Sequence, residues 1–434
     1  MNGKECLKME WKYSDYVQYC GLENLPEGLD VIFPSYRPEA RDFLIDRDFL
    51  GKAYDRFQLP EEKRKLFTKA VEAVEADRKL LVFTQFLVWD MCSARNRCDV
   101  DNYTNMTPKC MPELAEYYSL ILLLACVVPS VGKMEERGIP KHYYEKIPYT
   151  PMKSQFEKYV KTGSVQVSDF PWDMNFYTCS IFLLDRFYFI PCKFEDTFTM
   201  YRNKKSDRII ALRYAGEEFR RDGQVNGINK VFDEAGKFVS VWQETADEIR
   251  ANRINPMGYV EKIPVTIKKD EWNVALQYGD IMLGFHIPSG PGYTPERVKN
   301  SMKLALDFFI KYFPEIPIKG FWSESWLYDT HLSLILKKDS NIVRVQDQFF
   351  KYPINKGDDM LRYEAFGDWK ADPVTAEPKT TLQKKAVAYM AAGGRFNTLS
   401  MVVLSKEADR MGEAPYITEK DREEFQRAVD SHLK

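Results

Sequence analysis

The most constraining feature of the sequence is a strand–turn–helix–strand pattern in its second half. Asp280–Pro288 is an almost continuous apolar run, which is typical of a strand covered on both faces. The turn-forming residues Pro288–Gly292 follow, and then Thr294 and Pro295, which are favoured at a helix N-cap and in the first helical turn. A second apolar and aromatic run, Ile318–Tyr328, predicts the next strand. This order predicts a βαβ unit with a right-handed crossover.

The helix of this unit is predicted to be amphipathic and to end before Pro314. Apolar residues recur at spacings of three and four along one face. They are Val298, Met302, Ala305, Leu306, Phe309 and Phe313. Charged residues cover the other face, namely Glu296, Lys299, Lys303, Asp307 and Lys311. The turn before the helix therefore presents backbone amides and the positive end of the helix dipole, a setting in which phosphates bind well.

The residue pattern changes near position 180, and a chain of 434 residues is long enough for two domains. Helix-periodic runs precede this position. They are Pro38–Phe57, Pro60–Met91, Pro112–Val128 and Met152–Thr162. Short β-branched and aromatic runs follow residue 184. They are Phe187–Pro191, Thr197–Arg202, Ile209–Tyr214, Lys237–Glu244 and Tyr259–Ile267. We therefore expect a helical N-terminal domain over residues 1–180 and a mixed α/β domain over residues 181–434.

The last ninety residues mix both kinds of element. Met360–Phe366 and Thr398–Leu404 predict strands, and Leu382–Ala391 predicts a helix. The final twenty residues are charged and helix-periodic, so we expect a surface helix there. This part forms a C-terminal extension of the second domain.

Composition argues against several classes of partner. The chain has 62 basic and 64 acidic residues, and its formal charge of −2 offers no general attraction for nucleic acid. Its most apolar stretch, Tyr118–Val128, is about half the length that a bilayer crossing needs, which predicts a buried core helix and no membrane partner. The first residues are charged and aromatic, unlike a secretory signal. We therefore expect a cytoplasmic protein.

The metal-ligating residues show no metal-site pattern. The eight cysteines include no CxxC pair, and the chain has only four histidines. Cys92, Cys98 and Cys110 lie fairly close in sequence, but no histidine lies near them. Reduced thiols, Cys6 among them, and no metal are therefore expected. Hydrolase, NTPase and Rossmann functions also lack support, because G-x-S-x-G, P-loop and G-x-G-x-x-G motifs are missing.

Several segments resemble a bacterial family of GNAT-like N-acyltransferases. The strings GDIMLGFHIPSGPGYTPERVKNSM, FFIKYFPE, SESWLYD and SNIVRVQDQF are similar to its C-terminal domain. Trp172–Phe189 resembles the junction between the family's helical N-terminal domain and its acyltransferase-like domain, and Thr381–Gly394 resembles its C-terminal region. The resemblance implies an α+β fold, in which a helical N-acyltransferase N-terminal domain precedes a GNAT-like mixed α/β domain with a central, mostly antiparallel sheet.

The resemblance also implies an acyl-CoA co-substrate. In GNAT folds the pantetheine arm lies where two parallel strands separate, which implies cofactor contacts from Phe285, His286 and Ile287. The pyrophosphate would lie over the turn, at Ser289, Gly290, Gly292, Tyr293 and Thr294. This turn departs from the usual [QR]-x-x-G-x-[GA] pattern, because Pro288–Tyr293 lacks the leading Gln or Arg. Pro291 also removes one amide that could bind phosphate.

Three residues are candidates for catalysis. Glu324 is predicted mid-strand with Trp322 and Trp326 on its own face, where desolvation would strengthen its carboxylate as a base. The alternative for Glu324 is a structural ion pair with a lysine or arginine from a nearby helix. His286 would deprotonate an amine, or would be a hydrogen-bonded core residue. Tyr328 would protonate the departing thiolate, as tyrosine often does in GNAT enzymes, or would pack with its hydroxyl outward.

These features favour an N-acyltransferase that moves an acyl group from acyl-CoA to a small-molecule or peptide amine. The acceptor amine would attack the thioester while a backbone N–H at the end of the Asp280–Ile287 strand polarises the carbonyl. The alternative is a non-enzymatic ligand-binding or protein-interaction module on a degenerate GNAT fold. The departure at Pro288–Tyr293 favours this alternative.

Overall fold

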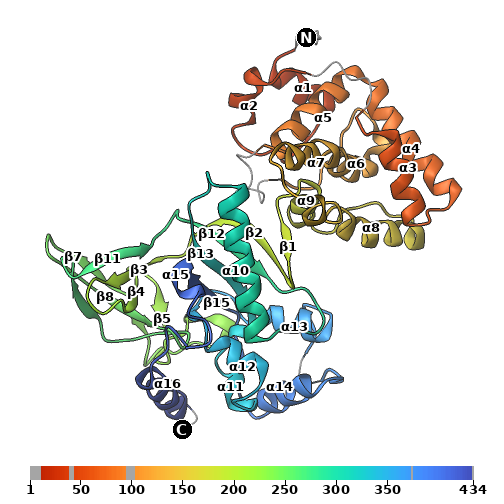
Figure 1. The fold of residues 1–434 in the computed structure, drawn as a ribbon. Coiled ribbons are helices and arrows are strands. Elements are labelled where there is room, and N and C mark those ends of the chain that lie inside the picture. Colours follow the sequence, from red (N-terminus) through yellow and green to blue (C-terminus); the bar gives the residue numbers. More distant parts are fainter. Residues whose placement is uncertain (1–10, 39–43, 94–102, 373–374, 433–434) are drawn as a thin grey trace. The chain divides into compact units, whose positions relative to one another are not determined.

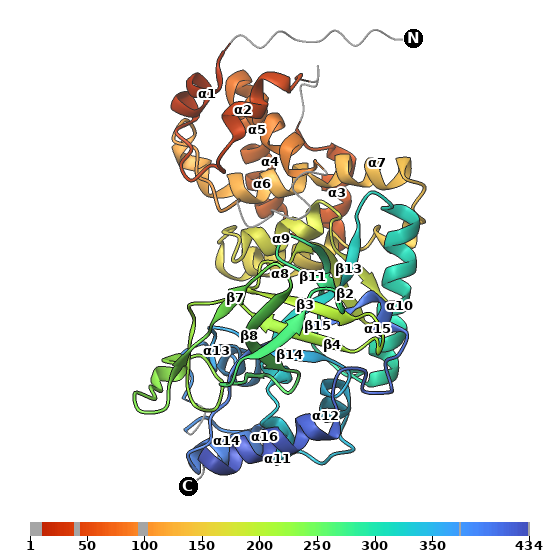
Figure 2. The same cartoon turned by 90° about the vertical axis from the view of Figure 1, so that its left-hand side faces the viewer.

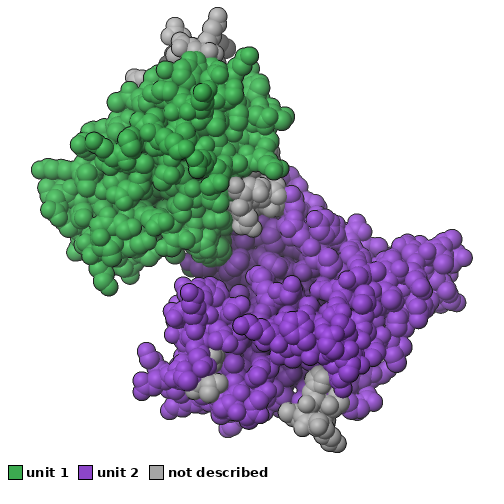
Figure 3. All heavy atoms as spheres, turned by 180° about the vertical axis from the view of Figure 1, so that it is seen from behind, with its two compact units in different colours: residues 1–183 green, residues 184–434 purple. Residues whose placement is uncertain are grey.

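The structure is a computed structural model with two compact units, Met1–Leu183 and Leu184–Lys434 (Figure 1; Figure 3). It describes residues 11–38, 44–93, 103–372 and 375–432. Cys6 and Cys98, expected as reduced thiols, lie outside the described residues. The six cysteines within them are free thiols.

The first unit is helical. Its α-helices are α1 Tyr13–Cys20, α2 Leu29–Ile32, α3 Arg47–Arg56, α4 Glu61–Ala76, α5 Arg78–Met91, α6 Tyr118–Ala125, α7 Val127–Glu136, α8 Tyr149–Thr162 and α9 Phe170–Tyr177. The predicted run Pro60–Met91 is two helices, because Asp77 leaves helical geometry and its carboxylate accepts hydrogen bonds from the first amides of α5. Within the helical stretch Pro112–Glu136, which is long and apolar enough to cross a bilayer, 67% of the most apolar window is buried. All eight residues of α6 are buried, as predicted for a core helix.

The second unit is built on a six-stranded sheet with the order β1-β2-β12-β13-β15-β14. The bounds are β1 Phe182–Leu184, β2 Phe187–Lys193, β12 Ile281–His286, β13 Ile318–Ser325, β15 Leu399–Leu404 and β14 Phe350–Pro353. β12 and β13 run parallel, whereas β2, β15 and β14 pair antiparallel with their neighbours. Helix α10, Pro295–Tyr312, connects the parallel pair and lies across one face of the sheet (Figure 1). The predicted α+β class with a mostly antiparallel central sheet is confirmed.

A second, antiparallel sheet covers the other face of the central sheet (Figure 2). Its strands are β10 Val265–Lys268, β8 Glu248–Asn255, β4 Ile209–Arg213, β3 Phe198–Asn203 and β11 Trp272–Leu276, with β7 Trp242–Glu244 and β9 Tyr259–Val260 also paired to β8. One hydrophobic cluster joins the two sheets, and it contains Phe198 and Met200 from the second sheet with Met282 and Val402 from the central one. The central sheet is therefore packed on both faces, as the apolar run around β12 predicts. A small hairpin, β5 Glu218–Phe219 with β6 Phe238–Val239, lies beside these sheets.

The remaining elements correct two predictions. The segment predicted as a strand at Met360–Phe366 is instead helix α13, Asp359–Phe366, in which Arg362 pairs with Asp358 at i,i+4 spacing. The strand predicted over Ile318–Tyr328 ends at Ser325, because the Ser325 hydroxyl caps the 3-10 helix η7, Trp326–Tyr328. The other helices are α11 Leu332–Ile335, α12 Asn341–Gln346, α14 Thr381–Ala391, α15 Ser405–Ala408 and α16 Glu419–His432.

A buried lysine on β14 makes the stability of the second unit depend on pH. Lys351 is fully buried, and its ammonium donates to the carbonyl oxygen of Gln346 at 2.7 Å. Burial lowers the pKa of Lys351 from 10.5 to about 7. Between these two pH values the unfolded chain binds a proton that the folded chain does not, so the free energy of unfolding rises as pH rises through this window.

We expect Lys351→Met to raise the melting temperature most at pH 6, by the equivalent of about 2–4 kcal/mol, because the variant no longer buries a charge. The gain should shrink as pH approaches 10, because the folded side chain is already neutral there and the unfolded side chain begins to lose its proton. Thermal unfolding of both proteins between pH 6 and pH 10 measures this. Lys319→Met, at an exposed position of β13, is the matched control and should show no such trend. A gain for Lys351→Met that stays constant across the pH range would contradict the prediction.

Candidate active site

The parallel pairing between β12 and β13 ends before either strand does. The register pairs Leu283 with Phe321 and Gly284 with Trp322, and the ladder stops there. β12 continues to His286 while paired with β2, and β13 continues to Ser325 while paired with β15. The facing edges of the two strands therefore separate at their carboxyl ends. This is the geometry that the GNAT resemblance implies for a pantetheine arm.

The turn after β12 is organised by Arg186, which lies in the tight connection between β1 and β2. Its guanidinium donates to four successive carbonyl oxygens of the turn: Pro288 (2.7 Å), Ser289 (3.2 Å), Gly290 (3.0 Å) and Pro291 (2.8 Å). In a trans peptide the N–H points opposite to the C=O, so the amides of Ser289, Gly290 and Gly292 point away from Arg186. These three amides make no hydrogen bond within the part of the chain that the structure describes. They are available to an anion.

Two glycines allow this backbone path. Gly290 and Gly292 have φ angles of 103° and 101°, which L-residues with a side chain rarely adopt. A Cβ on Gly292 would lie 3.1 Å from Nη1 of Arg297 and 3.4 Å from Nε of Arg186. Two guanidinium groups therefore flank the turn at Gly292.

The start of α10 adds to the positive character of the turn. The Thr294 hydroxyl accepts the amide of Arg297 at 3.3 Å, so Thr294 is the helix N-cap that the sequence predicts. Asp185 anchors this end of the helix, since its carboxylate accepts from Arg297 at 2.7 Å and from Ser301 Oγ at 3.2 Å. The hydrogen bond from Arg297 lowers the pKa of Asp185. The turn thus lies between the helix dipole and two cations, one of them paired.

Glu324 lies on β13 and is ion-paired with Lys356. Its side chain is 24% exposed. By strand alternation Trp322 shares its face, but Trp326 belongs to η7, so the expected flanking by two indoles is wrong. The strand ends earlier than predicted. The ion pair that was the alternative for Glu324 is present, but Lys356 lies in the loop between β14 and α13 and not on a helix.

A half-buried carboxylate, that of Asp196, accompanies Glu324 on this face. The indole N–H of Trp322 donates to Asp196 at 3.0 Å and to the Tyr352 hydroxyl at 2.8 Å. Tyr352 donates to the same Asp196 carboxylate. Burial raises the pKa of Asp196. Asp196 was not predicted, because only the fold brings the β2–β3 connection beside β13.

His286 lies on the same face of the sheet as Glu324, since the register aligns Gly284 with Trp322 and each residue is two positions further along its strand. The missing side chain at Gly284 makes room for the imidazole: a Cβ there would lie 3.3 Å from Nε2 of His286. Burial lowers the pKa of His286 to about 4, so the imidazole is neutral at pH 7.

Tyr328 lies on the opposite side of the sheet from these two residues. It is buried in η7, and its hydroxyl donates to Ser323 Oγ at 3.0 Å. Burial raises the pKa of Tyr328. The predicted alternative of an outward-facing hydroxyl is therefore wrong. The structure brings Glu324 and His286 to one face and places Tyr328 behind β13.

The predicted cofactor residues occupy different settings. The Phe285 side chain is buried against Phe187, with ring centroids 4.8 Å apart, so its backbone is the part that can meet a ligand. Ile287 is half-buried directly after β12. The Tyr293 hydroxyl is buried without a hydrogen-bond partner among the described residues, and burial raises the pKa of Tyr293. Within the described residues no group of three or more His, Cys, Asp or Glu side chains could hold a metal ion.

The comparison with known families agrees with this architecture. Residues 48–179 match the N-acyltransferase N-terminal domain, and residues 191–402 match the GNAT-like C-terminal domain. The chain belongs to the GNAT-like N-acyltransferase family. Its first unit is the N-acyltransferase N-terminal domain, and its second unit contains the GNAT-like domain.

Solved structures share the fold of this family member at low identity. Two are acyltransferase structures, one of a mutant in complex with octanoyl-CoA and one in complex with decanoyl-CoA. Each is 16% identical, with a TM-score of 0.52 over 91% of this chain and 99% of that chain. A third, with decanoyl-CoA and teicoplanin, has a TM-score of 0.51 at 16% identity over 90% of this chain and 98% of that chain. No curated protein matches the sequence.

Arg186 explains how this family member departs from the usual GNAT turn. The sequence pattern lacks a leading Gln or Arg at Pro288, but the fold supplies a guanidinium from a different hairpin. The sequence contained one signal for it, an Asp-Arg pair at the break between two apolar runs. Asp185 adopts a φ of 58°, which marks a tight turn. Such a turn can be expected from the pattern, but its contact with the distant Pro288–Pro291 segment cannot.

Proposed function

We propose that the second unit transfers an acyl group from acyl-CoA to an amine acceptor. Two features that lie next to each other support this proposal. The edges of β12 and β13 separate, and the turn after β12 directs three amides, which have no partner among the described residues, away from Arg186. The pyrophosphate of CoA is a polyanion that the amides of Ser289, Gly290 and Gly292 can bind. Where β12 and β13 separate, backbone groups on their facing edges no longer pair with each other and can hydrogen-bond the pantetheine arm. Acyltransferases of the same fold have been solved with octanoyl-CoA and decanoyl-CoA, which supports an acyl-CoA donor.

In the proposed reaction the acceptor nitrogen attacks the thioester carbonyl. The new C–N bond forms, the amine proton passes to Glu324 directly or through water, and the C–S bond breaks to release CoA as a thiolate. A backbone N–H at the end of β12 polarises the carbonyl oxygen. The thiolate then takes a proton from water, because the predicted proton donor Tyr328 lies behind β13 with its hydroxyl bonded to Ser323.

The two candidate bases have different roles in this proposal. His286 is neutral at pH 7 and a weak base, because its pKa is about 4. It is therefore suited to accept a hydrogen bond from the amine and orient it. Glu324 is partly exposed and lies on the same face, so it is the residue placed to take the proton. One solved relative of this fold also holds teicoplanin, which supports a small-molecule or peptide acceptor.

The rival hypothesis, a non-enzymatic module on a degenerate fold, was based on the missing Gln or Arg at the turn. Arg186 and Arg297 now provide two guanidinium groups there. Pro291 costs one amide, but three others remain directed away from Arg186. The specific reason for the rival is therefore removed.

We expect Ser289→Glu to weaken binding of acetyl-CoA, longer acyl-CoAs and free CoA at least about tenfold, because a carboxylate would face the pyrophosphate. Ser289→Gln is the matched control, since it has the same size without the charge. Ser289 is exposed, so neither variant should disturb packing. Calorimetric titration measures the affinities. Equal affinities for the Glu and Gln variants would remove the turn from the cofactor site.

We expect Glu324→Gln to lower kcat about 10²- to 10⁴-fold, the usual contribution of a general base. The assay follows release of the CoA thiol with a panel of primary amines and short peptides as acceptors. Lys356→Met is the control, because it breaks the ion pair and keeps the carboxylate. If the carboxylate acts only through the ion pair, both variants will lose the same activity, and the base assignment fails.

A further inference from the structure

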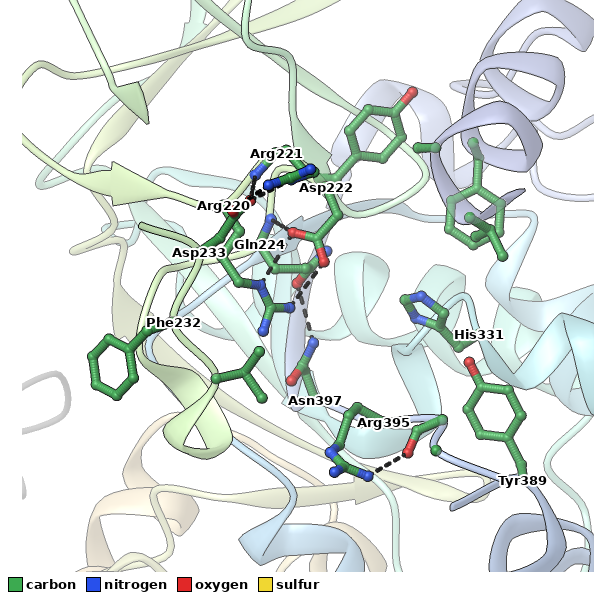
Figure 4. Close-up of a pocket in the computed structure, with 17 residues that line it drawn as sticks. Arg220, Arg221, Asp222, Gln224, Phe232, Asp233, His331, Tyr389, Arg395 and Asn397 are labelled. Atoms are coloured by element: carbon green, nitrogen blue, oxygen red, sulfur yellow. Dashed lines mark hydrogen bonds and ion pairs between the residues drawn. The ribbon is translucent and has the colours of Figure 1, made fainter. Parts of the chain in front are cut away.

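A cavity of about 470 Å³ lies in the second unit, apart from the turn and the separated strands (Figure 4). It is lined by the β5–β6 hairpin region, by His331 after η7, by the segment between α14 and β15, and by α16. The lining residues used below are Arg220, Arg221, Asp222, Asp233, Phe232, His331, Tyr389 and Arg395. A volume of this size holds a small organic ligand.

The charges that line the cavity leave one cation in excess. Arg220 pairs with Asp222 at 3.0 Å, and Arg221 pairs with Asp233 at 2.7 Å. Among the described residues, Arg395 donates only to the carbonyl of its neighbour Gly394 at 3.0 Å. Three guanidinium groups against two carboxylates give a net charge of +1. This suits a monoanion such as a carboxylate, whereas a polyphosphate would need several unpaired cations.

His331 is held in one orientation at the wall of the cavity. Its Nδ1 lies 2.7 Å from Oδ1 of Asp329. The other oxygen of that buried carboxylate accepts the amide of Asn397 at 2.7 Å. Asp329 therefore fixes the ring, and Nε2 has no partner in the described part of the chain. A ring fixed by one nitrogen presents the other to a ligand.

Tyr389 and Phe232 complete the lining. The side chains of Tyr389 and His331 approach each other in the cavity (Figure 4). The Tyr389 hydroxyl makes no hydrogen bond within the residues that the structure covers. Phe232 is 65% exposed and also lines the cavity. The cavity thus offers an open guanidinium, two open polar groups and an apolar rim.

We propose that this cavity binds a small, partly apolar monocarboxylate of the amino-acid or short-peptide class. Arg395 is the partner of the carboxylate, His331 and Tyr389 hydrogen-bond the adjacent polar group, and Phe232 covers the apolar part. The proposal uses no residue of the acyl-CoA turn, so its test does not depend on whether the protein transfers acyl groups.

The test is calorimetric titration of the full chain with N-acetyl-L-phenylalanine and with N-acetyl-L-phenylalaninamide, which differ only in the carboxylate. We expect the acid to bind at least about tenfold more tightly than the amide. Arg395→Gln should remove this difference, and Arg410→Gln, an exposed arginine outside the cavity, should keep it. His331→Gln should weaken binding of both ligands.

Three outcomes would overturn the proposal: equal binding of acid and amide, an acid preference that survives Arg395→Gln, or inorganic phosphate binding as tightly as the acid. Acetyl-CoA titration of the same variants separates this site from the active site. Normal acetyl-CoA affinity without carboxylate binding refutes only the cavity proposal. Carboxylate binding without acyl-CoA binding refutes only the acyltransferase proposal.

Discussion

The parallel pairing of β12 with β13 determines the layout of the second unit. Antiparallel neighbours can be joined by a short turn, but a parallel pair needs a crossover, and here α10 supplies it. The crossover places the N-terminus of α10 at the carboxyl end of β12, where the ladder stops. The site for an anionic ligand and the separated strand edges are therefore consequences of one topological choice.

Arg186 fixes the conformation of the turn that follows β12. A proline- and glycine-rich turn has many backbone conformations, and fixing one of them costs conformational entropy. By gathering four carbonyls, the Arg186 guanidinium selects one conformation in which the alternate amides face outward. The same hairpin contributes Asp185, which holds Arg297 at the helix start. One tight turn thus positions both guanidinium groups of the site.

The sequence was sufficient for features set by local chemistry and insufficient for those set by distant contacts. Thr294 and Pro295 define the start of α10 through capping rules that operate within one helical turn. Met360–Phe366 misled because a short apolar run fits a strand or a buried helix equally well. The pairing of Glu324 with Lys356, and the contact of Arg186 with Pro288, join residues that are 32 and 102 positions apart. Periodicity carries no information about such pairs.

The two proposed ligand sites of the second unit differ in the groups that would bind an anionic ligand. At the turn, three outward amides and the helix dipole are directed to the ligand, while Arg186 is bonded to the carbonyls behind these amides and Arg297 is paired with Asp185. In the cavity, Asp222 and Asp233 neutralise two of three arginines and leave Arg395 alone. A diphosphate would leave uncompensated charge in the cavity, and a carboxylate would leave amides unsatisfied at the turn. The two regions therefore differ in the groups that would bind an anion, which are backbone amides at the turn and one arginine side chain in the cavity.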